Sequence, residues 1–509
     1  MCGGTPIVIR AALQTHAIPS ASTPELIVVA AVYFVVCAGI ATWAARRTRT
    51  AEDFFVAGKG IGLWTMTLAA MAATLSGFIF IGGPGLLYQA GVGVLFISLS
   101  ASMTTPMSAW ALARRMRLLR EVRNVITVPD AVGARYRSPT AQGICAAAIL
   151  VATVTYVATN LLALGYVLNA VFGMSVSTGV LVGTIVVVAY SATGGILAGV
   201  YTDVFQGTIK AIASVLVFTT VLRAGNGLGG ISRTILAHEP TFLGPWGHLT
   251  PLAALSFFLV FGLGTLGQPH VISKYYMLRD PRQLRWYPLL MTVVLLVTLL
   301  LFFSIGLGVK AAVLTGEMAP LAQRDDAAPM FLLHRASPWL AGIVFSGIAA
   351  AIMGTVNAFL NVGAAAVSHD LPLAFGRRVG NELRVGRIAT IAIAGAAAAL
   401  ALLPGQVVAF LGIFAWGLFA STLVPSLAIG MNWRGATRAG AIASMTVGLV
   451  VTLVLESVNF LRVYQLPAGV MPSGLALVLS IITFFVASWA TRGEAAGDLD
   501  PDVQLVMEA

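Results

Sequence analysis

Two ionisable residues lie inside a long apolar part of the chain, and both could bind or carry a cation. Asp203 and Lys210 are the only charged residues between positions 176 and 222. On a helix, their spacing places Lys210 on the same face as Asp203 and about 10 Å farther along the axis. Inserting an ionisable group into a membrane helix costs about 2.5–3.5 kcal/mol, and such groups mark ion or proton pathways. The pair is therefore a candidate for cation chemistry.

Each of these residues also has a structural interpretation. A carboxylate in the first turn of a helix accepts hydrogen bonds from free N–H groups, and Asp203 would do so if a helix began near residue 202. The stem of Lys210 could extend along its helix and bring the ammonium group to the membrane surface. The sequence leaves both interpretations open.

The elements that position these residues must be membrane helices. The chain has 509 residues, of which 58% are hydrophobic and only 10% are charged. Soluble proteins carry about 25% charged residues, so this composition excludes a soluble enzyme. A membrane-embedded enzyme would need His, Cys, Asp or Glu clustered within the spans, and the candidates that we identify there, Asp203 and Lys210, form no such cluster. We therefore expect no enzyme.

A helix needs about 20 consecutive apolar residues to cross a bilayer. We predict an all-α polytopic membrane protein with about thirteen such helices, at residues 25–45, 62–88, 91–113, 141–171, 176–194, 202–222, 252–273, 286–311, 339–368, 386–403, 406–430, 437–456 and 472–491. They form one transmembrane domain, residues 24–492, between an N-terminal segment, 1–23, and a tail, 493–509.

The basic residues predict the orientation of this domain. Lys and Arg collect in short cytoplasmic loops. Alternate loops are basic, above all the segment 114–123 with its five arginines, and another contains Lys274, Arg279, Arg282 and Arg285. This pattern places the segment 1–23 outside the cell (inner) membrane and the tail 493–509 in the cytoplasm. The net charge of +11 is thereby assigned to topology. Membrane lipid is an expected partner and nucleic acid is not.

Two spans contain glycine and proline at membrane depth. The second has SG at 76–77 and GGPG at 82–85, and the seventh has GLGTLGQP at 262–269. Because these spans are five helices apart, we predict two inverted five-helix repeats, at about 62–222 and 252–430, with broken helices 2 and 7 around a site near the midplane. Alternatively, GGPG ends a helix early and the glycines of the seventh span allow close packing.

Several segments resemble the sodium/solute symporter family. They are DFFVAGKG at 53–60, GGPGLLYQAG at 82–91, TVPDAVGARY at 127–136, YSATGGILAGVYTDVFQG at 190–207, GQPHVISKYYMLRD at 267–280 and FAWGLFASTLVPSLAIGMNWRGATRAGAIAS at 414–444. The resemblance covers about residues 24–490. It implies a core of ten helices in two inverted repeats with extra helices outside.

The resemblance also implies a sodium site. Its ligands would be the backbone carbonyls of Ala72, Leu75 and Ala351, with two neighbouring hydroxyls of a Met-Ser-Thr stretch. This chain reads Met353-Gly354-Thr355 there, so Thr355 remains and one hydroxyl is missing. Some members carry acidic residues where this chain has Thr74 and Asn357. The family places a carboxylate corresponding to Asp203 close to the ion path.

Lys210 suggests a second coupling ion. It would lie on the fifth helix of the ten-helix core, where some proton-coupled amino-acid transporters with a similar core place a lysine in the sodium position. A desolvated lysine can release its proton near neutral pH. The gain of Lys210 and the loss of a hydroxyl at Gly354 would explain each other, so the coupling ion is either sodium or a proton.

Six polar or aromatic residues would face the substrate according to the family pattern. They are Thr74, Ser76, Asn160, Thr265, Gln268 and Trp416. Each could instead hydrogen-bond its own helix, join helices or pack as core. AAVSHDL at 365–371 resembles the monocarboxylate branch, and GQPH resembles the proline branch. His369 and Asp370 suggest either solvated helix caps or a metal or proton relay.

The sequence therefore predicts a secondary active transporter that moves a small organic solute, a monocarboxylate or an amino acid, together with a cation by alternating access. No cofactor is expected apart from a possible sodium ion. The alternative is a transporter-like solute sensor that works with a separate signalling partner.

Overall fold

The computed structural model describes residues 23–46, 61–403, 408–461, 463–495 and 499–508. These residues form helices and turns, with one isolated β-bridge between Ile61 and Leu278. The first half contains α1 (Pro24–Ala45), α3 (Leu63–Thr74), η2 (Phe78–Gly82), α4 (Gly83–Ala90), η3 (Val92–Val94), α5 (Leu95–Ser108), η4 (Ala109–Ala113), α6 (Arg114–Arg123), α7 (Val128–Tyr136), α8 (Pro139–Phe172), α9 (Val176–Ala224), α10 (Gly227–His238) and η5 (Pro240–Leu243).

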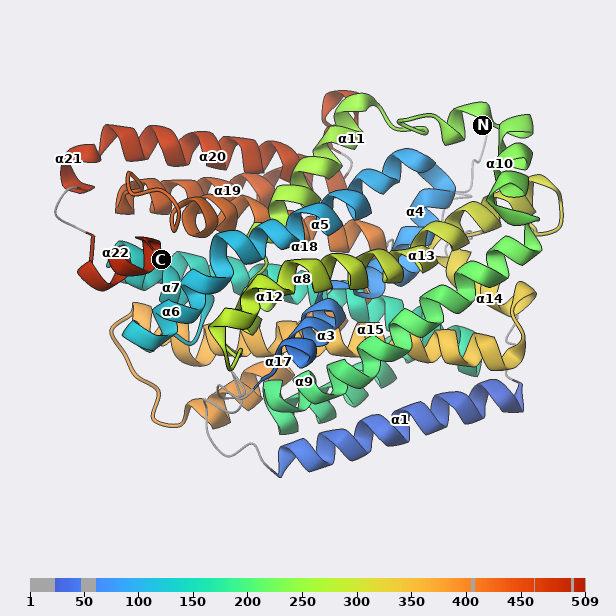
Figure 1. The fold of residues 1–509 in the computed structure, drawn as a ribbon, viewed down its shortest axis with the longest axis horizontal. Coiled ribbons are helices and arrows are strands. Elements are labelled where there is room, and N and C mark those ends of the chain that lie inside the picture. Colours follow the sequence, from blue (N-terminus) through green and yellow to red (C-terminus); the bar gives the residue numbers. More distant parts are fainter. Residues whose placement is uncertain (1–22, 47–60, 404–407, 462, 496–498, 509) are drawn as a thin grey trace, which may run out of the picture.

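The second half also consists of helices and turns (Figure 1). Its elements are α11 (Pro251–Phe257), η6 (Phe258–Gly262), η7 (Leu263–Gly267), α12 (Pro269–Tyr275), η8 (Pro281–Arg285), α13 (Tyr287–Leu314), η9 (Arg324–Asp326), α14 (Ala327–Arg335), α15 (Pro338–Ala365), η10 (Ala366–Asp370), α16 (Leu371–Ala374), α17 (Glu382–Ala401), α18 (Val408–Leu423), η11 (Val424–Ile429), α19 (Arg438–Phe460), η12 (Pro467–Gly469), α20 (Pro472–Ala490), α21 (Arg492–Ala495) and α22 (Pro501–Glu508).

The helices agree with the predicted all-α membrane class. Among the described residues, 10 helices are long and apolar enough to span a membrane, and the bent pair α3 with η2–α4 makes up to 11. Two shorter apolar helices, Pro24–Ile40 and Val176–Ala189, fall at the first and fifth predicted spans. The count of thirteen and the repeat boundaries 62–222 and 252–430 stay predictions. The predicted turn between the fifth and sixth spans lies within the continuous helix α9.

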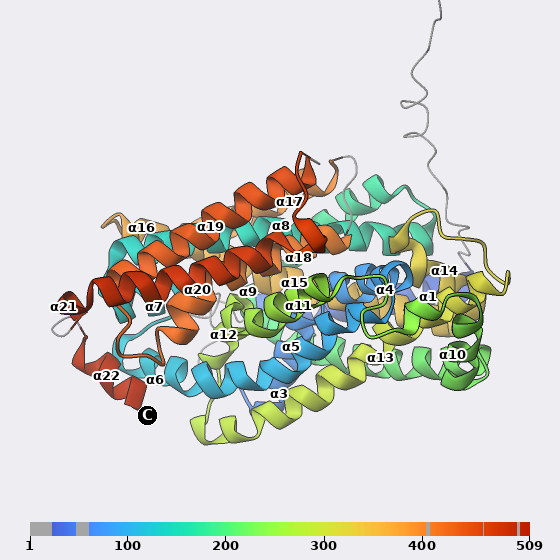
Figure 2. The ribbon, with the colours of Figure 1, turned by 90° about the horizontal axis from the view of Figure 1, so that it is seen from above.

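Three helices form the centre of the bundle. The candidate spans that contain α15 and α18 are 94% and 83% buried, whereas that of α19 is 33% buried. α8 packs against both α15 and α18. α19 and α20 run side by side along one edge of the bundle in both views, and α1 lies along the opposite edge in Figure 1 (Figures 1 and 2). The central helices are therefore shielded from lipid, which permits polar groups on them.

Both predicted broken spans are interrupted. α3 ends where Leu75 adopts an extended conformation (φ −91°, ψ 99°), and the chain bends by 56° before η2–α4. In the other span, the π-helical turn η6 passes into the 3-10 turn η7, and Gln268 is extended (φ −84°, ψ 105°) before α12. The GGPG run is not the break, because it lies inside η2 and α4. The alternative interpretation, in which GGPG ends a helix early, was therefore wrong.

The molecule has two distinct ends. α6, α7, α16 and α22 lie at one end, and α10 and α14 lie at the other (Figures 1 and 2). The tail contacts the end that carries the arginine-rich helix α6. Arg123 of α6 forms an ion pair with Asp500, and its Nε lies 3.2 Å from Asp502 Oδ2. Residues 1–22 and the DFFVAGKG segment, 53–60, lie outside the described residues.

Candidate functional site

The break in the second span is held open by side chains of α8. Asn160 Oδ1 accepts a hydrogen bond from the backbone N–H of Gly77 at 2.9 Å, and the Ser76 hydroxyl lies 3.0 Å from the Tyr156 hydroxyl. Ser76 Oγ also accepts from the N–H of Phe78 at 3.2 Å. These contacts satisfy N–H groups that a helix start leaves free. Asn160 and Ser76, predicted to face the substrate, thus form the break itself.

Lys210 lies on the carbonyl groups exposed by this break. Its Nζ donates to the carbonyl of Ala72 at 2.9 Å and to that of Leu75 at 3.3 Å, and the residue is 1% exposed. The last turn of a helix has unpaired carbonyls that attract positive charge. The ammonium group therefore contacts two of the three carbonyls at which the family resemblance implied a sodium ion. Extension of Lys210 to the membrane surface was a wrong interpretation.

The other predicted ligands lie on α15. Thr355 Oγ1 donates to the carbonyls of Ala72 at 3.2 Å and Ala73 at 3.3 Å, so it joins α15 to the same turn of α3. Ala351 is buried one turn earlier on α15, and among the described residues its carbonyl receives no hydrogen bond from Lys210. The structure thus brings Lys210 together with two of the three predicted carbonyls and with the remaining hydroxyl.

Gly354 is the position at which the family motif has a second hydroxyl. A Cβ atom built there would lie 2.6 Å from Asp203 Oδ1 and 2.8 Å from Gln206 Oε1. Both oxygens are buried and have no hydrogen-bond donor within the described part of the chain. The space of the missing side chain is therefore taken by two acceptors from α9. Gln206 was not predicted, although it lies in the YTDVFQG segment.

Asp203 pairs with a lysine that the sequence assigned to a cytoplasmic loop. Asp203 Oδ2 lies 3.4 Å from Lys274 Nζ, and each side chain is 1% exposed. Asp203 lies inside α9 and not in its first turn, so the capping interpretation was wrong. Lys274 was expected only as a topology signal, but it is a buried partner of the acidic residue. Asp203 is therefore flanked by cationic residues on α12 and on its own helix.

A small cavity, with about 20 Å³ of space for water-sized molecules, lies beside the break. Sites for small molecules are lined mostly by apolar side chains, and so is this cavity. Both broken spans contribute aromatic rings to its wall. The ring centroids of Phe78 and Phe261 lie 5.6 Å apart, and those of Phe261 and Trp416 lie 5.5 Å apart. Thr74 and Trp416, two of the six residues predicted to face the substrate, line this cavity.

The remaining predicted substrate residues lie in the second broken span. Thr265 Oγ1 donates to the carbonyl of Gly262 at 2.8 Å and to Thr104 at 3.0 Å, and Gln268 Nε2 donates to the carbonyl of Gly264 at 2.9 Å. Neither residue lines the cavity. Both side chains hydrogen-bond the irregular backbone of their own span, which is the alternative to substrate contact that the sequence left open.

Three polar groups near the aromatic wall lack partners. Trp416 Nε1, Gln268 Oε1 and both ring nitrogens of His270 are buried without a hydrogen bond among the described residues. His270 was not predicted. Its ring centroid lies 4.2 Å from that of Phe359 and 6.3 Å from that of Trp416. Buried polar groups are nearly always hydrogen-bonded, so these groups are candidates for contact with a polar ligand. The GQPH segment was the only signal for His270.

A buried acidic residue marks the opposite end of the bundle. Asp325 of η9 is 1% exposed, and its Oδ2 accepts from the N–H of Val408, the first residue of α18, at 2.9 Å. Burial raises the pKa of this carboxyl to about 6, against the lowering effect of the Val408 hydrogen bond. η9 also contacts α4 and η2, so Asp325 anchors α18 beside the broken span.

The fold and the site together define a class of protein. Two broken membrane helices that enclose a buried cavity, with a cation on the carbonyls of one break, are typical of a secondary transporter. The model of the Sodium:solute symporter family matches residues 54–448. The chain therefore belongs to the sodium:solute symporter family, whose members are transporters, and the resemblance found in the sequence is confirmed.

Curated relatives of this chain are similar over nearly their full lengths. The chain is 28% identical over 472 residues to the osmoregulated proline transporter OpuE of Bacillus subtilis, covering 90% of this chain and 95% of the relative. It is 27% identical over 474 residues to the sodium/pantothenate symporter of Escherichia coli, covering 91% of this chain and 96% of the relative.

Solved structures share the fold. A sodium-coupled sialic acid symporter in a substrate-bound, outward-open state matches with a TM-score of 0.75 at 16% identity, over 93% of this chain and 98% of that chain. A transporter of the nucleobase-cation-symport-1 family in a closed conformation matches with a TM-score of 0.55 at 12% identity, over 89% of this chain and 98% of that chain. The helical fold class is confirmed by these likenesses.

Proposed function

We propose that this protein carries a small amino or carboxylic acid across the inner membrane by alternating access, and that the coupling cation is a proton held by Lys210. The contact of Lys210 Nζ with the carbonyls of Ala72 and Leu75 carries the proposal. A sodium ion on these carbonyls would need the space that the ammonium group fills. It would also meet a like charge, which is strongly unfavourable in a buried site.

The surroundings of Lys210 support a proton pathway. Asp203 Oδ1 and Gln206 Oε1 converge at Gly354 without a donor in the described part of the chain, and a proton on Asp203 would supply one. Asp203 precedes Lys210 on the same helix face and contacts Lys274 on its other side. Lys210, Asp203 and Lys274 thus form a row of titratable groups from the broken span toward the basic end of the molecule.

The position of Lys210 gives a physical link between protonation and movement. The protonated side chain ties α9 to the last turn of α3, while Thr355 ties α15 to the same turn. Loss of the proton removes the charge that holds these carbonyls and weakens the contact of α3 with α9. Because α3 forms one half of the broken span beside the cavity, this change would favour a different orientation of that half-helix.

The substrate class follows from the unpartnered groups. Trp416 Nε1 is a buried donor on the cavity wall, and His270 offers a second ring donor nearby. Donors of this kind suit a carboxylate. Proline and pantothenate, named for two relatives, both carry a carboxylate. We infer a monocarboxylate or an amino acid, whose apolar part would contact Phe78 and Phe261.

The orientation proposed is the one predicted from the basic loops. Arg-rich α6 and the tail helix α22 lie at the same end of the molecule, which would be cytoplasmic, and the segment 1–23 would be outside. The row Lys210, Asp203 and Lys274 would then lead from the midplane to the cytoplasm.

Uptake into proteoliposomes tests the proposal. A panel of labelled monocarboxylates and amino acids would be supplied with a pH gradient or a sodium gradient, imposed separately. We expect the pH gradient to drive accumulation of one substrate and sodium to have no effect. Lys210→Met should abolish accumulation, while the matched variant Lys310→Met, which changes a lysine of α13 paired with Glu239, should retain it.

Two outcomes would contradict the proposal. Uptake that rises steeply with sodium at fixed pH, and is unchanged by Lys210→Met, would restore sodium as the coupling ion. Thermal stabilisation by a panel compound without uptake under either gradient would instead favour a solute sensor.

A further inference from the structure

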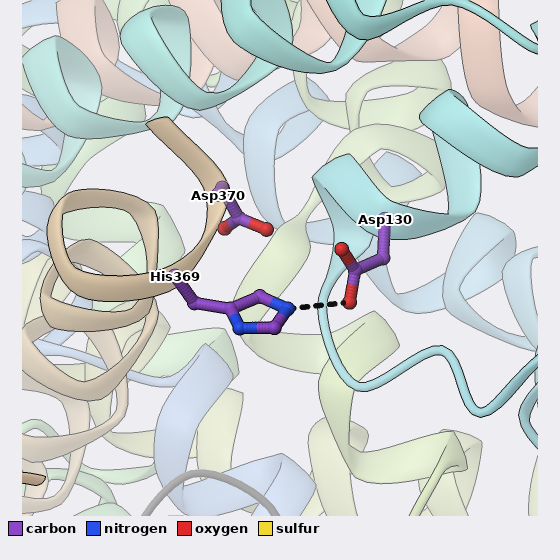
Figure 3. A group of neighbouring side chains, drawn as sticks. All are labelled: Asp130, His369 and Asp370. Carbon is purple, nitrogen blue, oxygen red and sulfur yellow. Dashed lines mark hydrogen bonds and ion pairs between the residues drawn. The ribbon is translucent and has the colours of Figure 1, made fainter. Parts of the chain in front are cut away.

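Three possible metal ligands from two distant segments converge at the basic end of the molecule. Asp130 lies on α7, and His369 and Asp370 lie on η10 (Figure 3). One ligand atom from each lies within 4.8 Å of the other two. Asp370 is 1% exposed, and it makes no side-chain hydrogen bond to the helix α16 that follows it. The interpretation of His369 and Asp370 as solvated helix caps was therefore wrong.

The cluster contains a buried acceptor without a donor. Asp370 Oδ1 accepts from the Thr127 hydroxyl at 2.5 Å, but Asp370 Oδ2 has no hydrogen-bond partner among the described residues. His369 Nε2 lies 3.1 Å from Asp130 Oδ2, so one imidazole faces two carboxylates. Buried carboxylates that face each other need a compensating cation, and a single imidazolium leaves Asp370 Oδ2 unpaired.

The groups around the cluster hold its ligands in place. Glu382 Oε1 lies 3.3 Å from His369 Nδ1, on the side of the ring away from Asp130. With a metal ion on Nε2, this contact would hold the ring proton on Nδ1. Such a carboxylate–histidine pair is the usual support of a histidine metal ligand. Asp130 is fixed by Gln142 Nε2, which donates to its Oδ1 at 2.9 Å.

We propose that Asp130, His369 and Asp370 bind a divalent metal ion, with Zn²⁺ as the preferred ion. Zinc sites with imidazole and carboxylate ligands are tetrahedral, with bonds of about 2.0–2.2 Å, so neighbouring ligand atoms lie about 3.3 Å apart. The observed 3.1 Å between His369 Nε2 and Asp130 Oδ2 agrees with this spacing. Rotation of the Asp370 carboxylate toward the other two ligands completes three protein bonds, and water supplies the fourth.

The metal would join two parts of the transporter that have different roles. α7 leads directly into α8, which holds the break of the second span, and η10 continues α15, which carries Thr355. A bound ion would fix the end of α15 to α7 and oppose any movement between them. The site therefore predicts slower transport when the metal is bound.

Metal binding by the full-length protein tests the proposal directly. The protein would be purified in detergent without a polyhistidine tag, stripped with a chelator and titrated with Zn²⁺. We expect one equivalent to bind and the apparent melting temperature to rise. Co²⁺ in its place should give the intense visible absorption of a tetrahedral site.

Variants separate this site from adventitious binding. Asp370→Asn and His369→Asn should weaken Zn²⁺ binding by at least about 100-fold, and Glu382→Gln by about 10–100-fold, as is typical of groups that support a ligand. His334→Asn changes an exposed histidine of α14 and should have no effect. Absence of stoichiometric binding to the unmodified protein, or equal binding by Asp370→Asn, would overturn the proposal, and neither result depends on whether His369→Asn folds.

Discussion

Replacement of Lys210 by alanine should open a sodium site at the carbonyls that its ammonium group contacts. The substitution removes an ammonium group that donates to the carbonyls of Ala72 and Leu75 at 2.9 and 3.3 Å. Hydrogen bonds from charged donors contribute about 1.5–3 kcal/mol each, so the loss of two should destabilise the protein by about 3–6 kcal/mol in choline chloride. The two carbonyls and the Thr355 hydroxyl then surround a space that a small cation can enter.

Sodium should restore part of this loss. If the variant binds sodium with a Kd of about 10 mM, then 150 mM sodium stabilises the folded state by about 1.6 kcal/mol. For a protein of this size, that corresponds to a rise in apparent melting temperature on the order of 2 °C. The assay is thermal unfolding in sodium chloride against choline chloride at equal ionic strength.

Two comparisons decide the outcome. The unmodified protein should show no difference between the two salts, because the ammonium group blocks the site. Lys210→Met should respond less than Lys210→Ala, because methionine keeps most of the lysine stem in place. An equal sodium response in the unmodified protein would refute the reasoning, and so would identical melting of Lys210→Ala in both salts.

Three further substitutions test other parts of the structure. Gly77→Ala should lower stability by about 1–3 kcal/mol, because the added Cβ would lie 2.6 Å from the Cβ of Ala163 on α8. Gly395→Ala is the control, since a Cβ there would have nothing within 4 Å. Equal melting temperatures of the two variants would contradict the packing argument. Trp416→Phe should raise the KM for uptake about tenfold and leave the melting temperature unchanged, because it removes the unpartnered N–H donor of the indole. An unchanged KM would show that the indole serves packing alone. The raised pKa of Asp325, about 6 against 3.8, makes the fold most stable below pH 3.8 and less stable as the pH rises through 6, by about 3 kcal/mol at most. Asp325→Asn should flatten this part of the melting profile between pH 4 and 7, and an unchanged slope would rule out this carboxyl as its source.

The sequence predicted the broken spans better than it located the breaks. Glycine and proline showed which spans are irregular, because only buried or cavity-lining backbone tolerates them. The first break lies at Leu75–Gly77, which includes the SG pair that the sequence named, and Asn160 and Ser76 supply alternative partners for the backbone there. The GGPG run stays helical. Propensity shows where a helix can break, but the partners that satisfy the free N–H groups come from a distant helix.

The candidate site was predicted in part. Ala72, Leu75, Thr355 and Lys210 could be placed together because their chemistry is local or follows the family motifs. His270 and Gln206 lie in the family-like segments GQPH and YTDVFQG but were not predicted, since a single histidine or glutamine in an apolar stretch is compatible with ordinary packing. Lys274 was misassigned because a basic residue near a helix end is usually solvated. Only its contact with Asp203 showed that it is buried.

Composition and periodicity determined that the chain is a helical membrane protein, because 10% charged residues cannot cover a soluble surface. The motifs determined the family, and the spacing of Asp203 and Lys210 made them candidates for charges at membrane depth. The tertiary structure alone decided that Lys210 meets the carbonyls of Ala72 and Leu75. It also decided that two acceptor oxygens fill the space at Gly354, and that Asp130 faces His369 from another helix. These features depend on the approach of segments more than 100 residues apart, and local sequence places no constraint on such contacts.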